Sequence, residues 1–410
     1  MKKFTILIAA VALVCFAAPA MAVDWNFYGN ARMSTFYEST DFGDGTNAAK
    51  TDDKDANLNW DLQGNSRFGA NIKAENITAR IEMGISESNV SSRRVYGVWN
   101  FGAGKLKVGK DYSPTSQFIS GQVFDGDLGL LGIGTSYSSR NGQISFSFGN
   151  FEIALVSPTT GLIEGMKDKT TTSLNVAQAL ATTTTGTAGV NQVAYVTPAS
   201  PTSTATFKGD VDDVLPKIEA GWGMSFDAWN FNLMGGFQYY SIEDVTSFQT
   251  AGSTDDVDVT SWVLGGDIGF NIGPGYIRGA LSYGSNIGNA GWSIPSGING
   301  RDNTYQGGLA VWDNDDDTND TTTFQGALVA GLKVSDMLSF EGGFGYRADM
   351  TDEGSQRDTK PWGAYVQSVI ALAPGVYVIP EVGYYDFDNT AKGAEAGSLF
   401  YLGGKWQINF

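Results

Sequence analysis

The sequence contains no histidine, and its only cysteine, Cys15, lies in an apolar stretch near the first residue. The rest of the chain therefore has no thiol and no imidazole, which excludes disulfide bonds, Cys/His zinc sites, cysteine nucleophiles and histidine acid–base catalysis. We accordingly expect neither enzymatic activity nor a cofactor. Basic residues are also scarce, since 26 Lys and Arg stand against 44 Asp and Glu, for a net charge of −18. Such an acidic balance disfavours nucleic acid as a partner.

The first 22 residues have the pattern of a secretory signal peptide. A basic start is followed by an apolar run and then by the small-x-small site Ala20-Met21-Ala22. We expect cleavage after Ala22, so that residues 1–22 are the signal peptide and residues 23–410 are the mature chain. Because Val14 stands where a lipoprotein signal prefers a small residue, we do not expect a lipid anchor at Cys15.

Beyond this segment the chain lacks any apolar run near the ~20 residues that a membrane helix needs. Glycine (53 residues) and aromatic residues (12%) are abundant instead. Apolar and polar side chains alternate with the two-residue period of a β-strand, as in the closing stretch 399–410, which ends on Phe410. One such strand also fits a soluble sheet, so the class of fold has to be inferred from the number and spacing of the strands.

Sixteen segments show this alternation. An even number of strands places both chain ends on one side, with seven short turns there and eight longer loops opposite. Since lipid cannot hydrogen-bond to the backbone, strands cross a membrane only as a closed sheet. We therefore predict an all-β fold, a 16-stranded antiparallel transmembrane β-barrel with short periplasmic turns and long extracellular loops. The predicted strands are 24–36, 57–74, 77–85, 94–101, 105–108, 136–148, 151–155, 217–226, 230–241, 259–271, 276–284, 322–334, 337–348, 362–372, 376–385 and 398–410.

Aromatic residues lie near the ends of these strands on the apolar face, where interfacial girdles of a membrane barrel are found. A soluble β-sandwich is the alternative, but its core would place aromatics in the middle of the strands. The girdle candidates are Trp25, Trp60, Trp99, Phe101, Phe148, Phe151, Trp222, Phe226, Phe270, Trp362 and Trp406.

The polar face carries charges of both signs, which suits a water-filled lumen, because sixteen strands enclose more space than side chains can fill. Residues 111–135 do not alternate, yet they contain apolar residues that need a packing surface, so we expect this third loop to fold inward. Its acidic residues would then face wall arginines across a constriction. Local pairing, such as Arg80 with Glu82, is the alternative. The candidate pore-lining residues are Arg32, Arg67, Arg80, Glu82, Arg94, Lys107, Asp125 and Asp127.

Two further segments interrupt the strand pattern. Residues 157–216 are rich in Thr and Ala and have too few large apolar residues for a separate domain, so we expect a long extracellular loop. The acidic run that begins at Asp313 resembles the start of a calcium loop but lacks its glycine and its closing glutamate. We therefore expect a solvated loop that weakly attracts divalent ions through Asp313, Asp315 and Asp317, with a specific metal site as the alternative.

Three stretches resemble the general porins of Gram-negative outer membranes, and in particular the homotrimeric porins of sulfate-reducing bacteria. They are Asn65-Ser-Arg-Phe-Gly69, Val108-Gly-Lys-Asp-Tyr-Ser-Pro114 and the terminal Phe410. The resemblance implies that the third loop narrows the pore, that three barrels associate, and that Phe410 is recognised by the barrel-assembly machinery. It also implies contact with outer-membrane lipid and lipopolysaccharide.

These observations together predict a passive diffusion channel for small hydrophilic solutes and ions in the outer membrane of a Gram-negative bacterium. A substrate-specific channel for sugars or oxyanions is the first alternative, and it would need a line of aromatics or arginines along the lumen. A surface adhesin or a soluble secreted β-protein is the second. The acidic excess favours cations and the basic wall residues favour anions, so the sequence leaves the selectivity open.

Overall fold

The computed structural model describes residues 23–41, 54–160, 210–212, 215–246, 254–293, 307–312, 318–351, 358–388 and 396–410. The predicted signal peptide, most of the predicted loop 157–216, and Asp313, Asp315 and Asp317 lie outside the described residues. Among the described residues, no helix is long and apolar enough to cross a membrane.

Among the described residues, the main sheet is antiparallel and contains 18 strands, and in two cases a pair of short strands forms one crossing. β2 and β3 pair with successive parts of β1, and β9 and β10 pair with successive parts of β11. The sheet therefore has sixteen crossings, which confirms the predicted number. The strands are β1 (Asp24–Asp41), β2 (Lys54–Leu62), β3 (Ser66–Ala74), β4 (Ile77–Ile85), β5 (Val90–Asn100), β6 (Lys105–Tyr112), β7 (Arg140–Phe148), β8 (Phe151–Val156), β9 (Asp210–Asp212), β10 (Lys217–Ser225), β11 (Trp229–Thr246), β12 (Thr254–Ile272), β13 (Gly275–Ser285), β16 (Thr321–Lys333), β17 (Leu338–Thr351), β18 (Trp362–Ala373), β19 (Val376–Asp386) and β20 (Ser398–Asn409).

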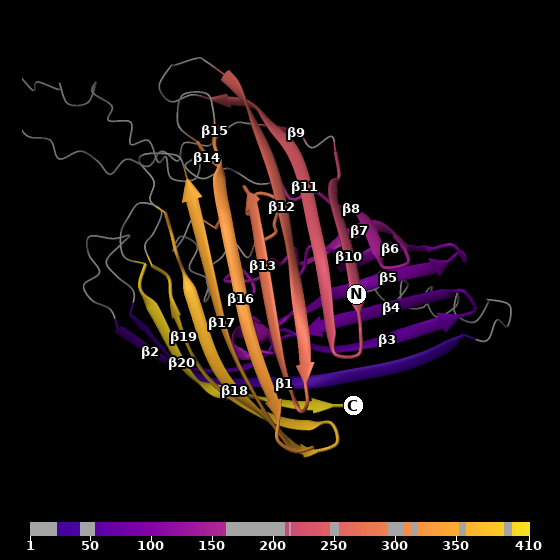
Figure 1. Ribbon diagram of the computed structural model, residues 1–410, viewed down its shortest axis with the longest axis vertical. Coiled ribbons are helices and arrows are strands. Elements are labelled where there is room, and N and C mark those ends of the chain that lie inside the picture. The colour runs from indigo at the N-terminus through magenta and orange to yellow at the C-terminus, as the bar shows by residue number, and fades with distance from the viewer. Residues whose placement is uncertain are drawn as a thin grey trace, which may run out of the picture.

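The sheet closes on itself because the last strand pairs with the first. β20 lies antiparallel to β1 from the pair Asn30 and Asn409 to the pair Asp41 and Ser398. Two backbone hydrogen bonds between Gly29 and Phe410, of 2.7 and 2.9 Å, extend this seam to the last residue. Figure 1 shows the strands of the N-terminal half crossing behind those of the C-terminal half. Closure leaves the described part of the barrel without an edge strand, as a lipid environment requires.

The outward face of the barrel is apolar. Of the predicted girdle residues, nine are exposed large hydrophobics: Trp25, Trp60, Trp99, Phe148, Phe151, Trp222, Phe226, Phe270 and Trp406. The inward face carries most of the buried polar and charged residues, including Glu82, Glu219, Glu341 and Glu381. This inside-out distribution is the one expected of a sheet with lipid outside and a polar interior.

The segment between β6 and β7, residues 113–139, folds against the inward face, and we call it the third loop. It includes the short helical turn α2 (Phe124–Asp127), and its residues Ile119, Val123, Phe124, Leu130 and Ile133 are buried. They pack with inward side chains of β18, β19 and β20 in one cluster. The predicted strand 136–148 begins only at Arg140, because residues 136–138 belong to this loop: Ser136 is bonded to Gln117 of the loop, and Ser138 is bonded to Glu219 of the wall.

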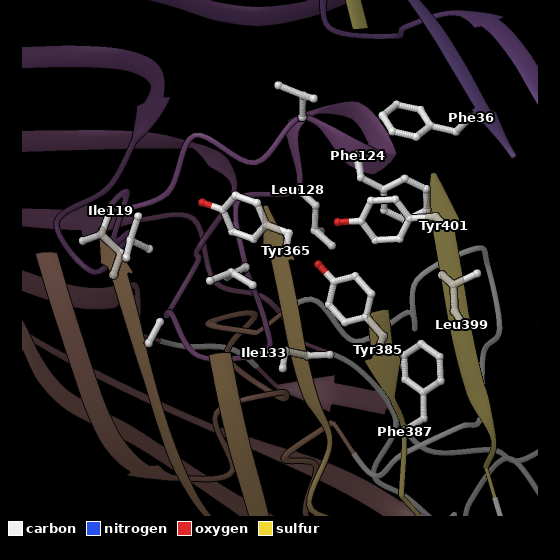
Figure 2. Packing of buried hydrophobic residues seen from close by; sticks show 14 of the residues in the cluster. Phe36, Ile119, Phe124, Leu128, Ile133, Tyr365, Tyr385, Phe387, Leu399 and Tyr401 are labelled. Atoms are coloured by element: carbon white, nitrogen blue, oxygen red, sulfur yellow. The ribbon is translucent and has the colours of Figure 1, made fainter. Parts of the chain in front are cut away.

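Figure 2 shows three tyrosines on neighbouring strands turning their hydroxyl groups toward the third loop. Tyr365, Tyr385 and Tyr401 each cover a glycine on the preceding strand: Gly343, Gly363 and Gly383. The missing side chain makes room for each ring against the wall. Phe124 of the loop stacks on Tyr401 at 3.7 Å between ring centroids. The loop thus packs against an aromatic surface formed by three strands.

A second segment also lies against the inner wall, and the sequence did not predict it. Residues 286–293 follow β13, and Ile287, Ala290 and Trp292 are buried. The Trp292 ring lies over Gly236 of β11, where a Cβ would come within 2.4 Å of it. The Trp292 carbonyl accepts hydrogen bonds from the backbone of Tyr137 and the hydroxyl of Ser136, so this segment supports the third loop from the other side.

Candidate functional site: the charged inner wall

Three wall glutamates hold the third loop in place. Glu219 accepts hydrogen bonds from Thr115 and Ser138, Glu341 from the backbone of Gly121, and Glu381 from the backbone N–H groups of Val123 (2.6 Å) and Phe124 (3.3 Å). All three carboxylates are buried. These carboxylates therefore interact with the loop and do not face the lumen.

Each glutamate also has partners within the wall. Tyr365 donates to Glu341 at 2.5 Å and Tyr401 donates to Glu381 at 2.7 Å. The Trp292 ring nitrogen donates to Glu219 at 2.9 Å, and the ammonium group of Lys217 lies 3.6 Å from the same carboxylate. Buried carboxylates are tolerated when they are hydrogen-bonded in this way. Sequence reasoning missed these three anchors, because their loop partners are more than a hundred residues away.

On another part of the inner wall, Glu82 of β4 is the centre of a basic group. It lies 2.6 Å from Arg80, 3.0 Å from Arg93 and 3.5 Å from Arg67. Tyr28 also donates to it at 2.8 Å. Three guanidinium groups therefore share one carboxylate.

Arg93 was absent from the predicted site because alternation places it on the outward face. A register shift opposite Glu82 and Met83 inserts one extra residue in β5, since Glu82 pairs with Arg94 and Met83 pairs with Ser92. Such a β-bulge lets consecutive side chains approach the same face. Both Arg93 and Arg94 consequently contact inward carboxylates. Two adjacent arginines at the start of a strand are the only sequence signal of this bulge.

Arg94 and Lys107 form a separate, balanced group. Arg94 lies 2.6 Å from Asp111, and Lys107 lies 3.4 Å from Asp111 and 3.1 Å from Glu152. Arg94 also lies over the rings of Tyr96 and Tyr112, with 5.4 Å to each centroid. Two cations and two carboxylates neutralise one another here.

The two aspartates of the third loop behave differently from one another. Asp127 contacts Arg32 and Lys405 directly, the latter at 2.7 Å, and accepts a hydrogen bond from Asn65. The structure thus joins this loop residue to the wall. Asp125 has an exposed side chain and forms no ion pair among the described residues.

The predicted site residues therefore divide into three groups rather than facing one another across one gap. Arg67 and Arg80 gather around Glu82, Arg94 and Lys107 gather around Asp111, and Arg32 pairs with Asp127. The local alternative that pairs Arg80 with Glu82 corresponds to the observed contact. In the described part of the chain, no cluster of three acidic residues could hold a metal ion.

Comparison with known proteins gives no matching family model and no matching curated protein. Solved structures of outer-membrane channels are similar. The outer-membrane channel DcaP of Acinetobacter baumannii has a TM-score of 0.63 and 14% identity, over 96% of this chain and 99% of that one. The chain has the porin fold.

Two further porins show the same likeness. The anion-selective porin from Comamonas acidovorans has a TM-score of 0.54 and 14% identity, over 95% of this chain and 100% of that one. OmpF of Salmonella typhi, solved with daunomycin, has a TM-score of 0.51 and 10% identity, over 95% and 99%. At these identities the likeness establishes the porin fold alone. The chemistry of the lumen depends on this chain's own residues.

Proposed function

We propose that the protein is a porin of the Gram-negative outer membrane, a passive channel through which small hydrophilic solutes and ions diffuse. The observation that carries the proposal is a closed barrel with an apolar outward face and a charged inward face on which a loop is anchored. An inward face of this kind would be costly in a dry core, since each buried charge needs a partner. Water in the lumen meets that need.

The side-chain exposures on the wall support a wet lumen. Arg80 and Arg67 retain 25% and 19% of their side-chain exposure although they lie on the inner face, and Glu152 retains 31%. These groups reach solvent inside the barrel. In this proposal the third loop narrows the channel, the turns face the periplasm, and the loop 157–216 faces the cell exterior.

The association of three barrels is part of the same proposal. It rests on the resemblance of the sequence motifs to homotrimeric porins of sulfate-reducing bacteria, and one similar solved structure, OmpT of Vibrio cholerae, is described as a trimer form. The outward face would then be shared between a partner barrel and outer-membrane lipid with lipopolysaccharide. Recognition of Phe410 by the barrel-assembly machinery belongs to the proposal as well.

Planar-bilayer recording of the purified, folded protein tests this function. We expect discrete conductance steps that group in threes, with linear current at low voltage, because an open trimer contains three parallel water-filled paths. Native mass measurement in detergent checks the trimer independently. A folded barrel that never conducts would refute the channel proposal, whereas single, ungrouped steps would refute only the trimer.

A further inference from the structure

The charges on one part of the inner wall do not balance. Among the described residues, five cationic side chains form ion pairs with only two carboxylates, Glu82 and Asp127, and we call these five the basic cluster. The neighbouring group around Asp111 is neutral and cannot compensate for the excess. The basic cluster consists of Arg32, Arg67, Arg80, Arg93 and Lys405.

The central carboxylate of this cluster is hidden from the lumen. Glu82 has 0% side-chain exposure, whereas Arg80 has 25% and Arg67 has 19%. An ion in the lumen therefore meets guanidinium groups rather than the carboxylate beneath them. The wall glutamates that anchor the third loop are buried too, so the exposed negative charge of the loop comes from Asp125 and from Asp127, whose side chain is 26% exposed.

Several guanidinium N–H groups in the cluster have no acceptor among the described residues. Arg93 donates to Glu82 through Nε, and no partner is present there for its two terminal nitrogens. Arg67 donates to the backbone carbonyl of Asn65 through Nε and approaches Glu82 through Nη1, which leaves Nη2 without an acceptor among these residues. Arg67 and Arg93 approach the same carboxylate oxygen, Glu82 Oε1, so their like charges lie close together and repel each other. An anion at this point would relieve the repulsion and accept the unused N–H groups.

We propose that the basic cluster is a binding site for small oxyanions and gives the channel a preference for anions over cations, opposite in sign to the net charge of the whole chain. The inference rests on the proposed channel function. Guanidinium groups suit oxyanions because they offer paired, parallel N–H donors that match two oxygens of a phosphate, sulfate or carboxylate. Local charge decides selectivity because charges elsewhere are screened within about 8–10 Å at physiological salt.

The first test measures selectivity in a planar bilayer under a tenfold KCl gradient. We expect the chloride-to-potassium permeability ratio to exceed one for the native chain. The double variant Arg67→Gln/Arg93→Gln should lower this ratio roughly two- to fourfold, as expected when two unit charges are removed ~10 Å from an ion in water. The matched control Lys360→Gln removes a positive charge from an exposed site outside the barrel strands and should leave the ratio unchanged.

The second test adds inorganic phosphate to the same bilayers and, separately, titrates it into the folded barrel in detergent by calorimetry. Phosphate should reduce the chloride current to a saturating level and bind with measurable heat, and both effects should disappear in the double variant. Arg93→Lys keeps the positive charge but loses the paired N–H donors of the guanidinium group. It should therefore preserve the permeability ratio while weakening phosphate binding several-fold. Heat-modifiable electrophoretic mobility shows that each variant is folded.

The outcomes separate the two proposals. A native ratio at or below one, or an unchanged ratio in the double variant, would overturn the assignment of anion preference to this cluster. Phosphate that neither binds in calorimetry nor saturates the block would overturn the binding site. A folded barrel that binds phosphate but never conducts would support the site and refute the channel function.

Discussion

At the scale of single residues, alternation predicts which face a side chain takes but not which partner it meets. Arg80 and Glu82 are two residues apart on one strand, so their contact follows from local geometry. Arg93 reaches the same carboxylate only because a bulge shifts the register of β5. The charge of the lumen wall therefore depends on one inserted residue that no periodic pattern reveals.

The variant Glu82→Gln should destabilise the barrel and increase its anion preference. It removes the negative charge shared by Arg67, Arg80 and Arg93, and losing the partner of a buried hydrogen-bonded group costs about 1–3 kcal/mol. Chemical unfolding followed by tryptophan fluorescence measures the loss of stability. Glu75→Gln, in the exposed turn between β3 and β4, is the matched control. Equal stability of the two variants would show that Glu82 does not hold the cluster together.

At the scale of elements, the position of the third loop follows from the surface that three strands build for it. The tripeptides Gly363-Ala-Tyr365 and Gly383-Tyr-Tyr385 occur on adjacent strands. Each tyrosine covers a glycine of the preceding strand, so that Tyr385 lies over Gly363 and Tyr365 lies over Gly343. Gln122 of the loop then donates to the hydroxyls of Tyr385 and Tyr401. The strand register thus places each tyrosine of this repeated motif beside a glycine, and the tyrosines together form the surface on which the third loop packs.

Replacing Glu381 with Ala should loosen the third loop. The change leaves the N–H groups of Val123 and Phe124 without their acceptor, at about 1–3 kcal/mol for each buried group. We expect larger and noisier single-channel currents, because a displaced loop obstructs the lumen less. Glu381→Gln retains one acceptor oxygen and should show an intermediate effect.

Glu243→Ala, at an exposed position near the loop end of β11, provides the control for removal of an acidic side chain. Currents of native size and noise in Glu381→Ala would mean that the remaining anchors at Glu219 and Glu341 suffice to hold the loop.

At the scale of the whole molecule, the barrel closes along the seam between β1 and β20, which extends to Phe410. Phe410 exchanges two backbone hydrogen bonds with Gly29, and its ring occupies the space beside that glycine, where a Cβ would come within 2.4 Å. The first and last strands are far apart in sequence, so their pairing carries the full entropic cost of closing the chain. Every contact at the end of this seam therefore matters for assembly.

Deletion of Phe410 should lower the fraction of folded barrel recovered in membranes. The truncated chain loses both closing hydrogen bonds and the ring that covers Gly29. The heat-modifiable shift in electrophoretic mobility measures the folded fraction. Phe410→Tyr keeps an aromatic ring and should assemble normally. Full recovery of the truncated chain would show that the seam does not depend on its last residue.

The sequence by itself determined the class of fold, the number of crossings and the inward or outward direction of most side chains. These features depend on a two-residue period, on turn residues and on the absence of long apolar runs, all of which are local. The apolar character of residues 111–135 also indicated that this segment needs a surface to pack on. For the candidate site, the sequence identified Arg32, Arg67, Arg80, Arg94 and Glu82 as inward residues, but not Arg93.

Only the tertiary structure decided which charges pair and which remain in excess. Glu381 and Val123 are 258 residues apart, and Asp127 and Lys405 are 278 apart, so no local pattern relates them. The bulge in β5 and the inward segment 286–293 likewise exist only once neighbouring strands set the register and leave space. Electrostatic energy depends on distances in space, and the closed barrel is what brings five cations around two carboxylates.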